Sequence, residues 1–305
     1  MSYKNLIIRN GKFLSMLDSQ LVVKRRGEET LSIPIEDISI ILVEDPYSNF
    51  SSRVLTELSK HGVILLFCDN SYMPTSFVLP YNQSYNQSKI LRAQICFSKQ
   101  IKAELWQKII KQKINNQESV IRYCNNDDYT IQYLSRYKNE VEINDTKNLE
   151  GIASKMFFSA LYGDDFIRFT ESGINLALNY GYSVLHAAII RHLCVMGFNS
   201  NLGIWHSSEK NAFNLASDLI EPFRPLVDYL LYWHQDDLEV PLSKDIRKKL
   251  VQLLKRRVKM NQKSLTVEYA MEQVVKNLLN IITTNDFKEF SLPEIEPIQF
   301  LENEL

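Results

Sequence analysis

The stretch at residues 79–114, LPYNQSYNQSKILRAQICFSKQIKAELWQKIIKQKI, decides the fold because the spacing of apolar residues changes within it. Residues 79–88 contain a direct repeat of Tyr-Asn-Gln-Ser and little apolar surface, which is typical of a linker. From Lys89 onward, apolar side chains recur every three or four residues, which predicts amphipathic helix. We therefore expect a flexible linker at 79–88 between two regions of different architecture.

The residues before the linker have the pattern of short strands. The runs FLSML (13–17), QLVVKRR (20–26) and ISIILVE (38–44) are apolar or alternating, and Gly27–Thr30 has the composition of a hairpin connection. A short helix is expected from Ser51 or Ser52 to Lys60, followed by the apolar strand GVILLFCDN at 62–70. This pattern predicts a small N-terminal β domain over residues 1–78.

The residues after the linker have helical spacing almost throughout. Beyond the first stretch, the predicted helices cover 147–162, 166–197, 208–219, 223–234, 243–259 and 264–283. Three prolines (Pro222, Pro225 and Pro241) fall at helix boundaries, where proline is tolerated. We predict an α+β protein whose larger C-terminal domain, 89–284, is all-α. The acidic segment 285–305, with two prolines, is expected to be an extended or poorly ordered tail that serves for docking.

Charge and composition narrow the classes of function. The formal net charge is −1, but residues 241–263 carry nine Lys or Arg against one Asp. Residues 89–113 carry seven basic residues against Glu104. Clustered positive charge is expected where a protein binds a polyanion, although a solvated helix face is an equal alternative. The nine glycines disfavour a Gly-rich phosphate loop.

No apolar run approaches the ~20 residues that cross a bilayer, and the N-terminus lacks the pattern of a secretion signal. We therefore expect a cytoplasmic protein with no membrane association. The four cysteines are scattered without C-x-x-C spacing, which predicts buried free thiols rather than a disulfide or a zinc site.

Polar residues where predicted helices begin or meet are candidates for a metal site. Glu150 opens the helix at 147–162, His206 precedes Ser207-Ser208, and Asp218 and Glu221 share one helical face. Two carboxylates and an imidazole form a site that suits Mg²⁺ or Mn²⁺. Such an ion stabilises the attacking and leaving oxygens in phosphodiester chemistry. Spacing alone leaves a structural role open, because glutamates commonly complement the dipole at a helix start.

Four separated motifs resemble one known family. They are E-G-x-A-x-K-x-F-F from Glu150, N-x-A-L-N-Y-G-Y from Asn175, G-I-W-H from Gly203, and D-L-I-E-P-F-R-P-L-V-D from Asp218. The motifs resemble the integrase family of CRISPR spacer acquisition, the first core CRISPR-associated protein. The likeness runs in order over nearly the whole chain. The length and the segment NAFNLASD (211–218) look most like the type II-A branch.

The resemblance implies that Glu150, His206 and Glu221 are the catalytic residues and the ligands of Mg²⁺ or Mn²⁺. It places Asp218 at a supporting acidic position and Asn175 at a position that braces the site. Trp205 departs from the family pattern, which leaves the shape of the local DNA contact open.

Arg224 is a further candidate on the evidence of spacing. It lies three residues after Glu221 between two prolines, and we expect it to hold Glu221 or to reach a phosphate.

The implied function is a metal-dependent DNA endonuclease and integrase that inserts short duplex fragments into a CRISPR array. The fragment's 3′-hydroxyl attacks a phosphodiester at a repeat boundary. Implied partners are double-stranded DNA (protospacer and CRISPR repeat), a second copy joined through the β domains, and a small ferredoxin-like second core adaptation protein. A type II effector nuclease and a ring-shaped accessory DNA-binding protein are further expected partners. A branched-DNA repair nuclease and a non-catalytic DNA-binding scaffold stay open as alternatives.

Overall fold

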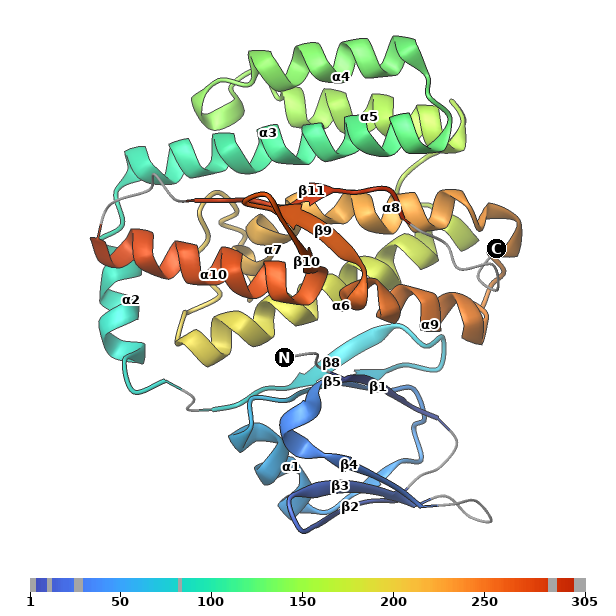
Figure 1. Cartoon of the computed structure of the whole chain (residues 1–305), viewed down its shortest axis with the longest axis vertical. Coiled ribbons are helices and arrows are strands. Elements are labelled where there is room, and N and C mark those ends of the chain that lie inside the picture. Colours follow the sequence, from blue (N-terminus) through green and yellow to red (C-terminus); the bar gives the residue numbers. More distant parts are fainter. Residues whose placement is uncertain (1–3, 10–12, 25–29, 82–83, 285–289, 299–305) are drawn as a thin grey trace.

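The computed structural model describes residues 4–9, 13–24, 30–81, 84–284 and 290–298 (Figure 1). A β-rich N-terminal region is followed by a largely helical C-terminal region, so the α+β prediction is confirmed. Over the part of the chain that is described, no helix is both long and apolar enough to cross a membrane.

Two sheets and one helix form the N-terminal region. The first sheet has the order β1 (Lys4–Ile8), β5 (Ile38–Val43), β7 (Ile64–Cys68), β8 (Pro74–Val78), with only β8 antiparallel to its neighbour. The second sheet has the order β4 (Leu31–Pro34), β3 (Gln20–Lys24), β2 (Phe13–Leu17), β6 (Asn49–Phe50). Helix α1 (Ser52–Lys60) begins where predicted, with Ser51 as its cap. Most of the predicted hairpin connection at 27–30 lies outside the described residues.

Strand β5 is buried on both faces because the first sheet is the middle layer of the molecule. Its side chains alternate between two cores, as successive side chains of a strand must. Ile40 and Leu42 pack among the helices, whereas Ile41 and Val43 pack against the second sheet and α1. This shared core favours a fixed angle between the two regions over a hinge at 79–88. The domain limits at 78 and 88 stay predictions.

We expect Leu42→Ala to destabilise the helical region, although Leu42 belongs to a strand. The side chain is fully buried, and the cavity left behind costs about 2–5 kcal/mol. The tryptophans (Trp106, Trp205 and Trp233) are all in the helical region, so their fluorescence in urea measures its unfolding. Leu17→Ala is the control because that side chain is 62% exposed. An unchanged midpoint for Leu42→Ala would mean that the two regions unfold independently.

Long helices dominate the C-terminal region. They are α2 (Gln87–Ile95), α3 (Lys99–Cys124), α4 (Asp128–Glu140), α5 (Leu149–Tyr162), α6 (Gly173–Met196), α7 (Asn214–Ile220), α8 (Arg224–Tyr232), α9 (Lys244–Gln252) and α10 (Val267–Thr284). Helices α3, α4 and α5 form a layer at the end of the molecule farthest from the β region (Figure 1). Helix α6 lies in the interior and contacts α7, α8, α9, α10 and the first sheet.

The helical prediction does not hold over residues 257–266. Of the predicted helix 243–259, α9 covers only Lys244–Gln252. The strands β9 (Arg257–Met260) and β10 (Lys263–Thr266) then form a hairpin, and β11 (Glu294–Ile295) adds a third strand beside β9. Asn261 and Gln262 both have positive φ, 51° and 61°, which suits a two-residue turn between antiparallel strands. In β9, Val258 and Met260 are buried between exposed neighbours, so the apolar spacing there is two and not 3.6.

The described part of the predicted tail, 290–298, packs on the chain itself. Phe290 and Ile295 are buried. The Asn116 amide of α3 donates to the carbonyl of Pro293 at 2.9 Å and accepts from the N–H of Ile295 at 3.2 Å. This segment therefore docks against helix α3. Residues 285–289 and 299–305 lie outside the described residues.

The cysteines are free thiols, as predicted, but they are less buried than expected. Cys96 is exposed, whereas Cys68, Cys124 and Cys194 are half-buried. Burial raises the pKa of Cys194 to about 11, so this thiol stays protonated at neutral pH.

Candidate functional site

Glu150 is positioned by the capped first turn of α5. The two carboxylate oxygens of Asp145 accept hydrogen bonds from the backbone N–H groups of Leu149 at 2.8 Å and Glu150 at 2.9 Å. Asn148, directly before the helix, adopts a left-handed conformation with φ 52°. The helix start is therefore satisfied by Asp145, which leaves the Glu150 side chain free to line a cavity.

His206 lies on the loop between α6 and α7, and the buried carboxylate of Asp218 holds this loop. Asp218 accepts hydrogen bonds from the backbone N–H groups of Ile204 at 2.6 Å, Trp205 at 3.1 Å and His206 at 3.1 Å. A side chain at Gly203 would overlap the carbonyl oxygen of His206, so the loop needs glycine there. The predicted helix 208–219 accordingly starts only at Asn214.

Asp218 also orients the imidazole of His206. One carboxylate oxygen lies 2.7 Å from Nδ1 of the ring, and this hydrogen bond raises the pKa of His206 above its ordinary value. When the ring is neutral, its proton stays on Nδ1 as the donor to Asp218. Nε2 then keeps a free lone pair, as in histidines that bind metals.

Glu221 lies in the 3-10 helix Glu221–Phe223, directly after α7. Its carboxylate is almost fully buried and pairs with Nζ of Lys113 at 2.6 Å and Nε of Arg224 at 2.9 Å. Burial by itself would raise the pKa of the Glu221 carboxyl group. The charges of Arg224 and Lys113 outweigh this and hold the pKa below its usual value. Glu221 is therefore ionised at neutral pH.

Lys113, on helix α3, joins the two glutamates. Its ammonium group contacts a carboxylate oxygen of Glu150 as well as one of Glu221. Burial would lower the pKa of Lys113, but the carboxylates of Glu221 and Glu150 reverse this and raise it. Two carboxylates from separate segments thus meet at one positive charge.

The predicted triad comes together at one cavity of about 520 Å³, lined by Glu150, His206 and Glu221 and also by Lys113 and Arg224. Among the described residues, no group of three or more His, Cys, Asp or Glu side chains is arranged to hold a metal ion. The donor set itself fits a hard divalent cation, because it offers two carboxylates and a free imidazole nitrogen. The Lys113 ammonium stands in for such a cation between the carboxylates.

Asn175 is buried near the start of α6 and acts through an arginine. Its side-chain oxygen accepts from Arg168 at 2.8 Å, and the oxygen of Asn179 accepts from the same guanidinium at 2.8 Å. Arg168 lines the cavity and lies 5.5 Å from the ring centre of Tyr182. Asn175 thus lies where a bracing residue would, one contact away from the cavity.

An aromatic wall lies beside His206. The rings of Trp106 and Trp205 stack with centroids 5.5 Å apart and planes within 5°. Trp106 also meets the His206 ring edge-on, with centroids 5.6 Å apart. Trp205 is 46% exposed, so the wall offers a flat apolar surface next to the imidazole.

Lys113 and Arg168, the cations that contact Glu150, Glu221 and Asn175, were not predicted from the sequence. The sequence pattern could have indicated Lys113, because Lys113, Asn116 and Gln117 are polar residues among the apolar, buried positions of α3. Polar residues on an otherwise apolar helix face favour a functional role. Arg168 falls within the predicted helix 166–197, but α6 starts only at Gly173, so the helical pattern did not indicate that this side chain lines the cavity.

Asp228 is a buried carboxyl group at the same cavity, apart from the triad. Both of its oxygens accept from the Tyr182 hydroxyl, at 3.0 and 3.1 Å. Burial raises the pKa of Asp228 to about 7, against the opposing effects of Tyr182 and Arg168. The folded-state pKa of Asp228 exceeds its unfolded value, so the protonated carboxyl group is compatible with the folded state below about pH 4. As the pH rises from about 4 to about 7, the free energy of unfolding falls, because the unfolded chain can ionise this group more easily.

We expect Asp228→Asn to remove this pH dependence. Relative to the variant, the natural protein should lose about 3 kcal/mol of unfolding free energy between about pH 4 and 7. Urea denaturation of both proteins across this range measures the difference. A difference that stays constant with pH would show that Asp228 ionises near its ordinary pKa.

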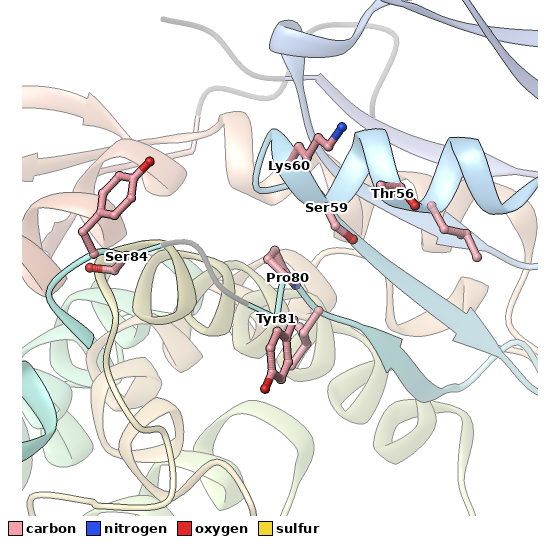
Figure 2. A pocket seen from close by; sticks show the side chains of 9 residues that line it. Thr56, Ser59, Lys60, Pro80, Tyr81 and Ser84 are labelled. Carbon is pink, nitrogen blue, oxygen red and sulfur yellow. The ribbon is translucent and has the colours of Figure 1, made fainter. Parts of the chain in front are cut away.

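A second hollow lies between α1 and residues 79–81, 84 and 85 (Figure 2). Its lining includes the hydroxyl groups of Thr56 and Ser59, the ammonium of Lys60 and the rings of Tyr81 and Tyr85. The described residues that line it include no carboxylate and no imidazole, which are the side chains that would hold a hard divalent cation.

The chain is similar in sequence to proteins named as CRISPR-associated endonucleases. It is 36% identical over 301 residues to the CRISPR-associated endonuclease Cas1 of Neisseria meningitidis serogroup C (strain 8013), and the match covers 98% of both chains. It is 25% identical to CRISPR-associated endonuclease Cas1 1 of Francisella tularensis subsp. novicida (strain U112), over 90% of this chain and 94% of the relative.

Solved structures share the fold. A casposase bound to integration product superposes with a TM-score of 0.77 at 20% identity, covering 100% of this chain and 97% of that chain. A chain of a Cas6-RT-Cas1–Cas2 complex superposes with a TM-score of 0.74 at 18% identity. The match covers 95% of this chain and 36% of that chain.

The sequence relatives, together with a cavity that collects carboxylates, an imidazole and cations, define the class as CRISPR-associated proteins. Residues 6–256 match the model of the family described as CRISPR associated protein Cas1. The chain belongs to the Cas1 family. The resemblance inferred from the four motifs is confirmed.

Proposed function

We propose that this protein is a metal-dependent DNA endonuclease and integrase that inserts short duplex fragments into a CRISPR array. The observation that carries the proposal is the meeting of Glu150, His206 and Glu221 at one cavity. These residues come from three separate segments, which a chance cluster of helix caps does not explain. The relative from Neisseria meningitidis is named an endonuclease, and the casposase is bound to an integration product.

The residues divide the proposed work. Glu150, Glu221 and Nε2 of His206 would hold Mg²⁺ or Mn²⁺, which would stabilise charge on the phosphate oxygens. Asp218 keeps the His206 ring in the required tautomer. Arg224 keeps Glu221 ionised. In the reaction, the 3′-hydroxyl of the fragment loses its proton as its oxygen bonds to a repeat phosphorus. The bond from that phosphorus to the 3′-oxygen of the cut strand breaks, and the leaving oxygen takes up a proton.

The proposed nucleic-acid partner is double-stranded DNA, both protospacer and repeat. The basic segment 241–263 presents exposed side chains at Arg257, Lys259 and Lys263 on the small sheet. Because phosphate contacts release counterions, DNA affinity should fall steeply as salt rises.

The proposed protein partners begin with a second copy of the chain. Exposed apolar side chains on the second sheet (Phe13 at 63%, Leu17 at 62% and Leu31 at 57%) support association through the β region. The small ferredoxin-like adaptation protein is supported by the fold match to a Cas1–Cas2 complex. The type II-A branch, its effector nuclease, the ring-shaped accessory protein and the cytoplasmic location are proposed on the motifs alone.

One assay separates the proposal from its two alternatives. The full chain, alone and with the small adaptation protein, is incubated with a supercoiled repeat plasmid and a short duplex. The duplex ends in a 3′-hydroxyl or, as the matched control, in a 3′-phosphate. An integrase joins only the hydroxyl form, and only with Mg²⁺ or Mn²⁺. A repair nuclease cuts branched DNA without joining, and a scaffold binds DNA without either reaction.

A further inference from the structure

Lys113 occupies the part of the cavity where the proposed metal ion must lie. Its Nζ atom contacts Glu150 and Glu221 together, 2.6 Å from the Glu221 oxygen. The side chain is only 10% exposed, so water does not separate the ammonium from the carboxylates. An ammonium nitrogen and a divalent ion cannot both lie between the same two oxygens.

The charges of the cavity make this a competition. The carboxylates of Glu150 and Glu221 carry two negative charges, and Lys113 and Arg224 balance them with two positive charges. A divalent ion therefore meets a pair of carboxylates whose charge is already balanced. If Lys113 leaves, the two carboxylates and Arg224 together keep one net negative charge, which attracts the ion.

The two cations differ in their freedom to leave. Lysine carries its charge on a flexible four-carbon stem. Arg224 is held in place, because Pro225 follows it and its guanidinium lies 4.8 Å from the ring centre of Tyr182. Lys113 is therefore the cation whose side chain can move away, whereas Arg224 keeps its ion pair with Glu221.

We propose that Lys113 is a built-in competitor for the metal ion. Its ammonium holds Glu150 and Glu221 together in the metal-free protein and must release both carboxylates before a divalent ion binds. The inference rests on the proposed function and adds a positioning residue that sets the metal affinity of the site.

The test measures Mn²⁺ binding to the full chain without DNA, by electron paramagnetic resonance at one pH. Lys113→Met keeps the apolar stem and removes the competing charge, so it should bind Mn²⁺ about tenfold more tightly or better. The matched control is Lys155→Met, which removes the same charge from an exposed lysine that lines the same cavity. It should change the affinity by less than about threefold.

Two further measurements keep the test decisive if Lys113→Met folds poorly. Lys113→Gln offers a polar replacement, and its melting curve reports folding. In the natural chain, acetylation mapped by mass spectrometry should modify Lys113 slowly without metal and faster at saturating Mg²⁺, whereas Lys155 reacts equally in both. The inference is wrong if the Lys113 variants bind Mn²⁺ no more tightly than Lys155→Met does. Glu221→Ala tests the proposed function separately. If this variant binds Mn²⁺ as tightly as the natural chain, Glu221 is not a metal ligand and the proposed metal site is wrong, whatever the Lys113 variants show.

Discussion

We expect Glu221→Gln to lower the rate of strand joining by about 10³-fold or more while duplex DNA binding is retained. Glutamine keeps the shape of the side chain but removes the charge that two cations, Lys113 and Arg224, now share. The proposed metal ion then loses a carboxylate ligand. The joining assay with a 3′-hydroxyl duplex measures the rate, and a gel-shift titration measures DNA binding.

Glu118→Gln is the matched control for this prediction. Glu118 is also a buried carboxylate that pairs with two cations, Arg122 at 2.8 Å and Lys138 at 2.9 Å. It does not line the cavity. Its variant should join DNA at nearly the natural rate even if it is less stable. Natural joining by Glu221→Gln would instead favour the non-catalytic scaffold.

The second large effect is expected for Asp218→Asn, which should reduce joining by about 10–100-fold. The carboxylate of Asp218 accepts three backbone N–H groups and orients Nδ1 of His206. An amide has only one acceptor oxygen, and its NH₂ group faces the remaining donors. The loop and the imidazole both lose their fixed position, with a stability loss of about 1–3 kcal/mol.

Asp69→Asn controls for the loss of a carboxylate that holds a turn. Asp69 accepts from the backbone N–H groups of Ser71 at 2.8 Å and Met73 at 3.0 Å, in the turn between β7 and β8. Both bonds go to one oxygen, which an amide retains, so the variant should keep its turn and join DNA at the natural rate. If Asp218→Asn is less stable but joins at the natural rate at a temperature where it is folded, then the orientation of His206 does not limit the reaction.

The basic segment 241–263 shows how far local pattern carries a prediction. Much of its charge lies at the surface, although Arg247 is buried and pairs with Glu44, and helix was predicted where a hairpin forms. Over 257–266 the alternation of buried Val258 and Met260 with basic residues fits a strand, whereas the preceding residues fit a helix. A short strand carries few apolar positions, so its period is easily read as part of the neighbouring helix.

The apolar spacing along the chain was enough to predict the two regions, and four motifs were enough to predict the family. The catalytic roles of Glu150, His206 and Glu221 stay predictions. The predictions of the regions and of the family both use residues that are close together in the sequence. The spacing of apolar side chains along a helix or strand indicates which of its faces is buried. The contacts of Lys113 were beyond such reasoning. It meets Glu150 across 37 residues and Glu221 across 108, and Asn175 reaches the cavity only through Arg168. Only the packing of α3 against α5 and the 3-10 helix brings these charges together, since a buried charge is stable only where the folded chain supplies its partner.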